Sequence, residues 1–223
     1  MTKIFFEVLR PGINTTIQDI GRNHLYHIGI TVSGAVDQRK YKIANNLVDN
    51  DLSEASIEFA YQGPHLKLKN GSINFAISGD VIFNIIRNNF KIEKGNCYQN
   101  YVLNDNEQLD IISTKNSVYG YLSVHGGFQL EKIWNSYSIN TKAEIGPNNG
   151  KKYSVNEKIF MKNSIIKDIE KRRIDYTDSY NGVIRIIRGT NFDYFSKKAK
   201  NFFINQQYTV TRLADRMGMR LDG

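Results

Sequence analysis

Short apolar runs and turn-forming residues alternate along residues 4–124 of the chain. Apolar and polar positions alternate in HLKL at residues 65–68, and the dipeptide Asn70-Gly71 that follows is typical of a hairpin turn. Runs of about five to seven residues, with turn signals roughly every 8–12 residues, are typical of a barrel or sandwich. Strands are predicted at residues 4–9, 13–17, 56–61, 65–68, 73–77, 81–86, 108–113 and 117–124. The pattern therefore predicts a mainly β fold with a few short helices.

Residues 10–50 hold two glycine-containing loops that are rich in polar side chains. Pro11-Gly12 predicts a tight turn, and an amide, a carboxylate and a guanidinium follow around Gly21, where the backbone can bend sharply. A second loop occupies residues 29–34. These two loops contain the first candidates for a functional site.

Asp37 is predicted to cap a helix that ends near Asn50. Its apolar face would consist of Tyr41, Ala44, Leu47 and Val48. The helix would fix the end of the second loop against the rest of the domain.

The polar loop residues leave two interpretations open. Polar groups removed from water need a partner or a ligand. In one interpretation Asp19 and Arg22 pair with each other and brace the loop. In the other, the two loops line a shared cleft, where Asp19 or Asp37 would act as general base.

His125-Gly126-Gly127 follows the last predicted strand of this region. Two glycines after a strand can present backbone N–H groups as a nest for an anion. The alternative is a tight turn in which His125 caps the strand. Both remain open at this point.

The C-terminal part predicts the beginning of a second β subdomain. Residues 183–187 have the pattern of a buried strand, Thr190 and Asp193 resemble a capping box, and residues 208–212 predict another strand. The predicted helix would bury Phe192, Phe195, Ala199 and Phe202. These elements are too few to cover a sheet. We expect domains at residues 1–175 and 181–223, the second one incomplete, with a charged connector of some helical character at 168–178.

Composition narrows the class of protein. Apolar residues make up 40% of the chain and aromatic residues 12%, which can supply a sizeable core. The net charge of +8 comes from scattered lysines and arginines, which disfavours nucleic-acid binding. One cysteine, Cys97, excludes an internal disulfide. The chain opens without a signal-peptide pattern, and no apolar run is long enough to cross a membrane, so we expect a cytoplasmic protein.

Several common catalytic signatures are missing from the sequence. There is no G-x-S-x-G nucleophile elbow, no H-E-x-x-H zinc motif and no complete P-loop, because residues 146–151 read GPNNGK. His24 and His27 are three residues apart, but the glycines around them favour a loop over a helix. We expect no metal site.

Four segments together resemble one known family. PGINTTIQDIGR, GITVSGAVDQ, IANNLVDN and IEFAYQGPHLKL, in this order and spacing, are similar to the opening of the biotin-dependent carboxyltransferase-like family. Its members include the C subunit of the ATP-dependent 5-oxoprolinase, part of urea amidolyase, and antagonists of a histidine-kinase inhibitor. The resemblance weakens at residues 135–139, where NSYSI replaces a family run of Gly-Ser-Arg-Ser-Thr, so that Tyr137 stands in place of an arginine.

The resemblance carries expectations for fold and function. It implies a cyclophilin-like β-barrel domain and, because the family motif DRMGxRLxG lies within a longer domain, a chain that is an N-terminal fragment or a naturally shortened product. It also implies a protein that works with 5-oxoprolinase subunits A and B, with ATP as co-substrate, to open 5-oxo-L-proline to L-glutamate. The alternatives are a biotin-dependent carboxyltransferase acting on urea or a related amide, a regulatory protein that binds a kinase inhibitor, and an inactive remnant.

Polar and glycine residues of the loops, the first helix and the C-terminal segment are the candidates for a functional site. The candidates for catalysis are Asp19, Arg22 and Asp37. Those for binding a small anionic substrate or a phosphorylated intermediate are Gln18, Ser33, Asn45, His125, Gly126, Gly127, Arg216 and Arg220. Arg216 and Arg220, four residues apart, would share one face if this segment is helical.

Overall fold

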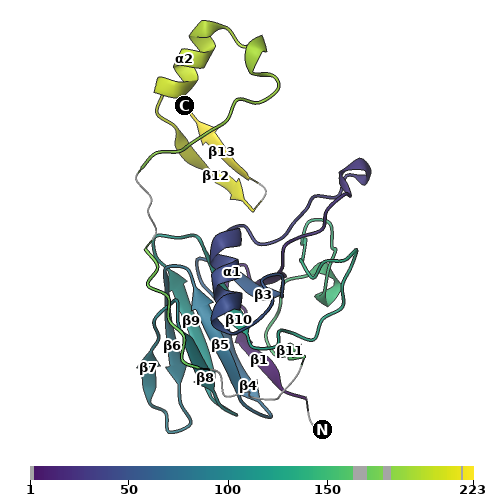
Figure 1. Ribbon diagram of the computed structural model, residues 1–223, viewed down its shortest axis with the longest axis vertical. Helices are drawn as coiled ribbons and strands as arrows, with labels where there is room; N and C mark the ends of the chain where they lie inside the picture. The colour runs from purple at the N-terminus through teal and green to yellow at the C-terminus, as the bar shows by residue number, and fades with distance from the viewer. Residues whose placement is uncertain (1–2, 163–169, 178–181, 217) are drawn as a thin grey trace. The chain divides into compact units, whose positions relative to one another are not determined.

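The computed structural model describes residues 3–162, 170–177, 182–216 and 218–223, and it divides the chain into two compact units. The first unit comprises residues 1–176 and the second residues 177–223. Both units are drawn in Figure 1. The predicted connector at 168–178 lies partly outside the described residues, and residues 170–177 contain no helix, so the expected helical character is wrong there.

Two antiparallel sheets form the first unit (Figure 1). The larger sheet has the order β11 (Lys158–Phe160), β1 (Phe5–Arg10), β4 (His65–Lys69), β9 (Gln108–Thr114), β6 (Val81–Ile86) and β7 (Ile92–Lys94). The smaller sheet has the order β2 (Thr16–Gln18), β3 (Ser56–Ala60), β10 (Tyr119–Val124), β5 (Ile73–Ser78) and β8 (Asn100–Leu103). The prediction of a mainly β fold is confirmed.

One hydrophobic core joins the two sheets. Leu66 and Phe83 of the larger sheet and Phe75 and Leu122 of the smaller sheet are fully buried in it. Phe75 and Phe83 meet edge to face across the core, with ring centroids 6.5 Å apart. Each of these side chains removes a large apolar surface from water, so the core holds the two sheets together.

Helix α1 (Gln38–Leu47) covers the outer face of the smaller sheet. Because of this cover, strand β5 is buried on both faces, whereas β4 of the larger sheet alternates between buried and half-buried positions. Asp37 caps the helix by accepting a hydrogen bond from the Lys40 N–H at 3.0 Å. The predicted cap is confirmed, and the predicted apolar face is buried.

The predicted strands of the first unit are confirmed within one or two residues, except that residues 13–17 shorten to β2. The prediction missed strands β7, β8 and β11, because an apolar–polar alternation cannot be recognised over only three or four residues. Two short 3₁₀ helices, η1 (Tyr26–Ile28) and η2 (Asn148–Gly150), complete the unit. Among the described residues, no helix has the length and apolar composition that crossing a bilayer requires.

The second unit consists of η3 (Phe192–Tyr194), α2 (Lys197–Asn205) and a hairpin of β12 (Thr209–Asp215) and β13 (Gly218–Asp222). Residues 183–187 are not a strand, which corrects the prediction. The cap of α2 is Ser196, whose hydroxyl accepts from the Ala199 N–H at 3.2 Å, so the capping box at Thr190 is also wrong.

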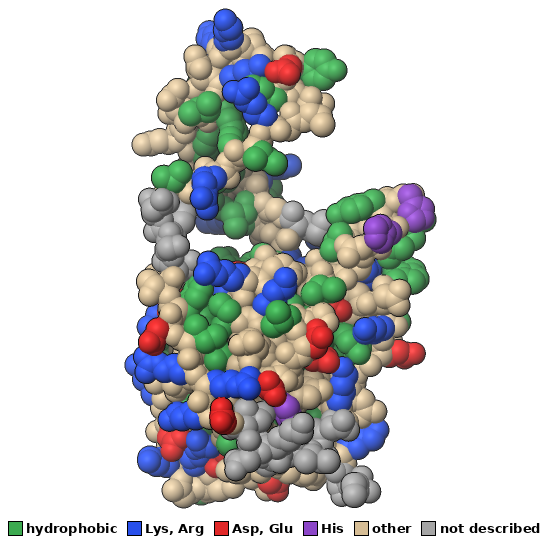
Figure 2. All heavy atoms as spheres, viewed as in Figure 1, with side chains coloured by type: hydrophobic (Ala, Val, Ile, Leu, Met, Phe, Trp, Pro, Cys, Tyr) green, Lys and Arg blue, Asp and Glu red, His purple; other side chains and the backbone are tan. Residues whose placement is uncertain are grey.

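The expected apolar core of the second unit does not form within the described residues. Ile187 is 95% exposed and Phe202 is 65% exposed, and Figure 2 shows hydrophobic side chains on the surface of this unit among lysines and arginines. A helix and one hairpin offer too little surface to bury that many apolar groups. The predicted helix face is confirmed only in part, because Phe192 and Phe195 lie before α2 and only Ala199 and Phe202 are on it. No described part of this unit buries Phe202.

Candidate functional site

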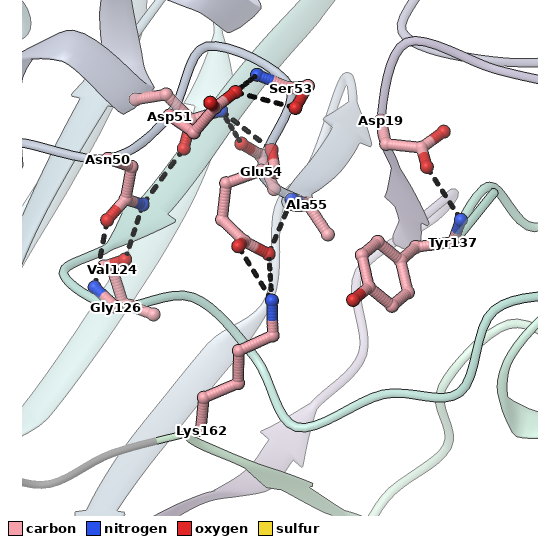
Figure 3. Close-up of polar contacts among 12 residues, drawn as sticks. Asp19, Asn50, Asp51, Ser53, Glu54, Ala55, Val124, Gly126, Tyr137 and Lys162 are labelled. Atoms are coloured by element: carbon pink, nitrogen blue, oxygen red, sulfur yellow. Dashed lines mark hydrogen bonds and ion pairs between the residues drawn. The ribbon is translucent and has the colours of Figure 1, made fainter. Parts of the chain in front are cut away.

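The carboxylate of Asp19 lies at the centre of a buried hydrogen-bond network. Its Oδ1 accepts from the Ser136 hydroxyl at 2.7 Å, the Ser138 hydroxyl at 2.6 Å and the Gly21 N–H at 2.8 Å. Its Oδ2 accepts from the Tyr137 N–H at 2.6 Å (Figure 3). Asp19 is 2% exposed, so its charge is stabilised by these four donors rather than by water. The network attaches the segment 136–138 to the loop that follows β2.

Arg22 is buried next to this network. It is 1% exposed, and its guanidinium donates to the Ser33 hydroxyl at 3.2 Å and to the Ser138 carbonyl. Burial lowers the pKa of Arg22, and the negative charge of Asp19 partly offsets this effect. Arg22 therefore holds the second loop, through Ser33, to the same segment that Asp19 holds.

Asp19 and Arg22 do not form the direct ion pair that the bracing interpretation expected. They act instead on the same residue, since Asp19 accepts from the Ser138 hydroxyl and Arg22 donates to its carbonyl. The two loops also bind each other through the backbone, because the Arg22 N–H donates to Val32 at 2.7 Å and the Ala35 N–H donates to Asp19 at 2.8 Å. The loops do brace one another, with Ser138 as the link.

Two buried side-chain atoms at this place have no hydrogen-bond partner among the residues that the structure describes. They are Oε1 of Gln18 and Nε of Arg22, and both side chains are almost fully buried. The amide nitrogen of Gln18 is satisfied, donating to Thr16 and to the Ile139 carbonyl, both at 2.9 Å. Unpaired buried groups are uncommon in folded proteins and deserve a functional explanation. Here they fall on two of the candidate residues.

Asp37 and Asn45 lie at the helix. Asp37, besides capping α1, is 3.2 Å from the Lys40 ammonium, and its own N–H donates to the Tyr121 hydroxyl at 2.7 Å. Asn45 is fully buried and donates to the Glu54 carbonyl at 2.8 Å. The structure thus places Asn45 on the buried face of α1, away from solvent. The roles proposed for Asp19, Arg22, Asp37 and Asn45 in catalysis and binding stay predictions.

His125, Gly126 and Gly127 form the tight turn, and the alternative of an anion nest with free N–H groups is wrong. The Gly126 N–H donates to the Asn50 side chain at 2.8 Å, and the Gly127 N–H donates to the Val124 carbonyl at 3.0 Å. The His125 ring contacts the Val48 carbonyl at 2.7 Å through Nδ1. Both amides are already used within the protein, so neither is available to an anion.

Glu54 and Lys162 form an ion pair beside this turn that the sequence did not reveal. The Lys162 ammonium donates to both carboxylate oxygens of Glu54, at 2.7 and 2.6 Å (Figure 3). The same ammonium lies 5.0 Å from the ring centroid of Tyr137. Glu54 and Lys162 are 108 residues apart, so no local motif could have predicted the pair.

Gly127 makes room for this ion pair, which gives a prediction with a matched control. A Cβ at position 127 would lie 2.5 Å from the carboxyl carbon of Glu54, whereas a Cβ at Gly126 would meet nothing within 4 Å. Both glycines have a positive φ, +77° and +76°, so alanine suffers the same backbone strain at each. We expect Gly126→Ala to cost about 1 kcal/mol and Gly127→Ala about 2 kcal/mol more, measured by urea unfolding. Equal costs would show that Glu54 is not held against the turn.

The Glu54–Lys162 pair also predicts a pH dependence. Burial by itself would lower the pKa of Lys162, but the hydrogen bonds and charge of Glu54 outweigh it and raise the pKa above its usual value. The pair therefore stabilises the fold fully below the pKa of an unfolded lysine, about 10.4, and this contribution is lost as the pH rises through the higher folded value.

The test compares the unfolding free energies of the wild type and Lys162→Met between about pH 8 and pH 11. We expect the difference to be largest at the lower pH and to shrink toward the upper end. In a Glu54→Gln background the difference should no longer shrink as the pH rises, because burial alone lowers the pKa of Lys162. A difference that grows with pH would contradict the assignment.

Arg216 and Arg220 belong to the second unit and are not on a helix. Arg216 follows β12 and Arg220 lies in β13, so the shared helix face predicted for them is wrong. Their predicted role in binding a substrate stays a prediction.

The described part of the chain has two further features that bear on ligands. It contains no group of three or more His, Cys, Asp and Glu side chains placed to hold a metal ion. An open polar cavity of about 580 Å³ lies near the turn after β6, away from every candidate residue. Its Arg87 already binds Glu93 and Glu107, at 2.7 and 2.8 Å.

Comparison with known proteins places the chain in a family. Residues 28–223 match the family model described as carboxyltransferase domain, subdomain A and B. The chain is 27% identical over 219 residues to the C subunit of 5-oxoprolinase from Haemophilus influenzae, a match that covers 97% of this chain and 68% of that protein. It is 25% identical to the urea amidolyase of Lachancea kluyveri, over 98% of this chain but 12% of that protein.

A solved structure shows the same fold. The urea carboxylase of Kluyveromyces lactis superposes on the whole of this chain and on 21% of its own length, with a TM-score of 0.81 and 22% sequence identity. The family model spans both units, so the match does not rest on the first unit alone. The chain therefore belongs to the carboxyltransferase domain family, subdomains A and B.

Proposed function

We propose that the chain acts as the C subunit of a 5-oxoprolinase, in the ATP-dependent opening of 5-oxo-L-proline to L-glutamate. The observation that carries the proposal is the match to the C subunits of the Haemophilus influenzae and Escherichia coli 5-oxoprolinases, each over 97% of this chain and 68% of the relative. The name of these relatives describes one part of a larger enzyme. We therefore propose that subunits A and B are its partners.

The chemistry suits a site made of several subunits. The amide of a five-membered lactam is a poor electrophile, so water attacks it slowly. Phosphorylation by ATP would convert it into an intermediate that water attacks more readily. Such a reaction needs cations and N–H donors arranged around developing negative charge. In this chain Asp19 and Arg22 are too buried to meet a ligand from solvent, so we assign them the task of positioning the segment 136–138.

The test is co-expression with candidate subunits A and B, followed by purification and an assay of glutamate formed from 5-oxo-L-proline. We expect turnover that requires ATP and all three subunits. A complex that assembles in fixed stoichiometry and forms no glutamate would overturn the proposal. A matched assay without ATP controls for unassisted hydrolysis.

A second candidate function rests on the urea amidolyase match. This chain would then transfer a carboxyl group from carboxybiotin to urea or a related amide, with biotin carried by another polypeptide. The same purified complex distinguishes the two functions. Consumption of urea that depends on a biotinylated carrier favours the second, and glutamate formation without biotin favours the first.

A further inference from the structure

The turn at residues 133–136 presents an exposed aromatic side chain in an unusual backbone conformation. Ile133 and Ser136 exchange backbone hydrogen bonds of 3.0 and 3.3 Å, and Trp134 and Asn135 between them have φ values of +50° and +60°. This is the geometry of a two-residue hairpin, where asparagine and glycine are usual and a bulky residue is not. Trp134 is nevertheless there and is 50% exposed.

Hydrogen bonds to the buried carboxylate of Asp19 hold this turn in place. Ser136 donates its hydroxyl to Asp19, and the Tyr137 N–H donates to the other oxygen of the same carboxylate. Because Asp19 is buried, the turn is attached to the interior of the first unit, not merely to the surface. The strained Trp134 is thus held on a rigid base, which is the arrangement expected where strain is retained for a function.

Two positive charges flank the Tyr137 ring at the base of this turn. The ammonium groups of Lys132 and Lys162 each lie 5.0 Å from its centroid. Lys162 is neutralised by Glu54, at 2.6 Å. Lys132 is exposed, and it has no carboxylate partner among the residues that the structure describes. One positive charge therefore stays unneutralised beside the Tyr137 ring, two residues before the exposed Trp134.

From this geometry we propose that Lys132, Trp134 and Tyr137 form a binding site for a small ring compound that carries a carboxylate. The ammonium of Lys132 binds the carboxylate, and the aromatic side chains contact the ring. Lys162 and Glu54 hold Tyr137 in place. The inference rests on the proposed function, because it assigns the carboxylate of 5-oxo-L-proline to Lys132, and it goes beyond that function by naming the residues that recognise this group.

Trp134 is the only tryptophan of the chain, so its fluorescence reports binding without any turnover. Three probes separate the parts of the ligand: 5-oxo-L-proline has ring, amide and carboxylate, 2-pyrrolidinone lacks the carboxylate, and cyclopentanecarboxylate lacks the amide. At constant, low ionic strength we expect both carboxylates to change the Trp134 fluorescence with saturation. We expect 2-pyrrolidinone to bind much more weakly.

Substitution of Lys132 tests its role. Lys132→Ala should raise the Kd of both carboxylates about tenfold, since a charge-assisted hydrogen bond is lost, and Lys132→Arg should keep the binding. The matched control is Lys158→Ala, which removes an exposed ammonium that lies 4.8 Å from the Phe5 ring, elsewhere on the first unit. It should leave all three affinities as they are.

The outcomes separate this inference from the proposed function. Equal effects of Lys132→Ala and Lys158→Ala, or no saturable response to either carboxylate, would overturn the inference, even if the assembled complex converts 5-oxo-L-proline. Binding of cyclopentanecarboxylate that depends on Lys132 would support the inference, even if the complex forms no glutamate. In that case the proposed function alone would fail.

Discussion

Replacing Asp19 with alanine is expected to lower the unfolding free energy of the first unit by about 3–5 kcal/mol. The change leaves the Gly21 and Tyr137 N–H groups and two serine hydroxyls without their acceptor in a buried place. It also leaves the guanidinium of Arg22 without the negative charge that partly compensates its burial. Each unsatisfied buried donor costs about 1–3 kcal/mol, and relaxation of the segment 136–138 recovers a part of the sum.

Urea unfolding followed by the fluorescence of Trp134 measures this loss, because that residue lies in the first unit. The control is Asp175→Ala, which removes an exposed carboxylate paired with Arg173 at 3.0 Å. The control should change stability by less than about 0.5 kcal/mol. A loss below about 1 kcal/mol for Asp19→Ala would mean that its network adds little to the fold.

Replacing Arg22 with alanine should cost about 2–4 kcal/mol in the same assay. The variant loses the bonds to the Ser33 hydroxyl and the Ser138 carbonyl, and it leaves a cavity where a fully buried side chain was. The cost is smaller than for Asp19 because the guanidinium was itself poorly solvated, as its lowered pKa shows.

The two substitutions are expected to be non-additive. Asp19 and Arg22 bind the same residue, Ser138. Either substitution alone therefore already loosens the segment around Ser138, and the second substitution has less left to disrupt. The double variant should therefore be more stable than the sum of the single effects predicts, by about 1–3 kcal/mol. If the losses of unfolding free energy were strictly additive, the two side chains would stabilise the fold independently of each other. Arg173→Ala, at an exposed ion pair, is the control for loss of a positive charge.

Local patterns in the sequence predicted most of the first unit. The β5 and β6 strands follow from apolar runs bounded by turn residues, and the cap at Asp37 follows from a carboxylate placed before an amphipathic segment. These features depend on neighbours within a few residues. The family resemblance added the expectation that the chain belongs with carboxyltransferase domains, which the family match confirms.

The candidate site was predicted only in part, because its contacts join distant segments. Asp19 and Arg22 drew attention as polar groups around a glycine, but their partners Ser136 and Ser138 lie more than 110 residues further along. The Glu54–Lys162 pair is equally remote in sequence. A single sequence does not reveal such pairs, because neither residue belongs to a recognisable local motif.

The prediction for the second unit failed for a different reason. The apolar periodicity of residues 192–202 predicts a helix with a buried face, but the helix forms only from Lys197 onward, as α2. Burial, however, requires a second surface to pack against, and the described hairpin does not provide enough of it. Periodicity tells which face of a helix is apolar, and it does not tell what covers that face.

Amide hydrogen exchange at Tyr137 tests the central claim most directly, namely that one buried carboxylate holds the turn at residues 133–136 to the interior. The Tyr137 N–H donates to Asp19 Oδ2 at 2.6 Å, so we predict slow exchange in the wild type. Asp19→Ala should speed this exchange far more than that of Leu122, in the middle of β10, which reports the global loss of stability. Fast exchange at Tyr137 in the wild type, or equal acceleration at both residues, would contradict the account.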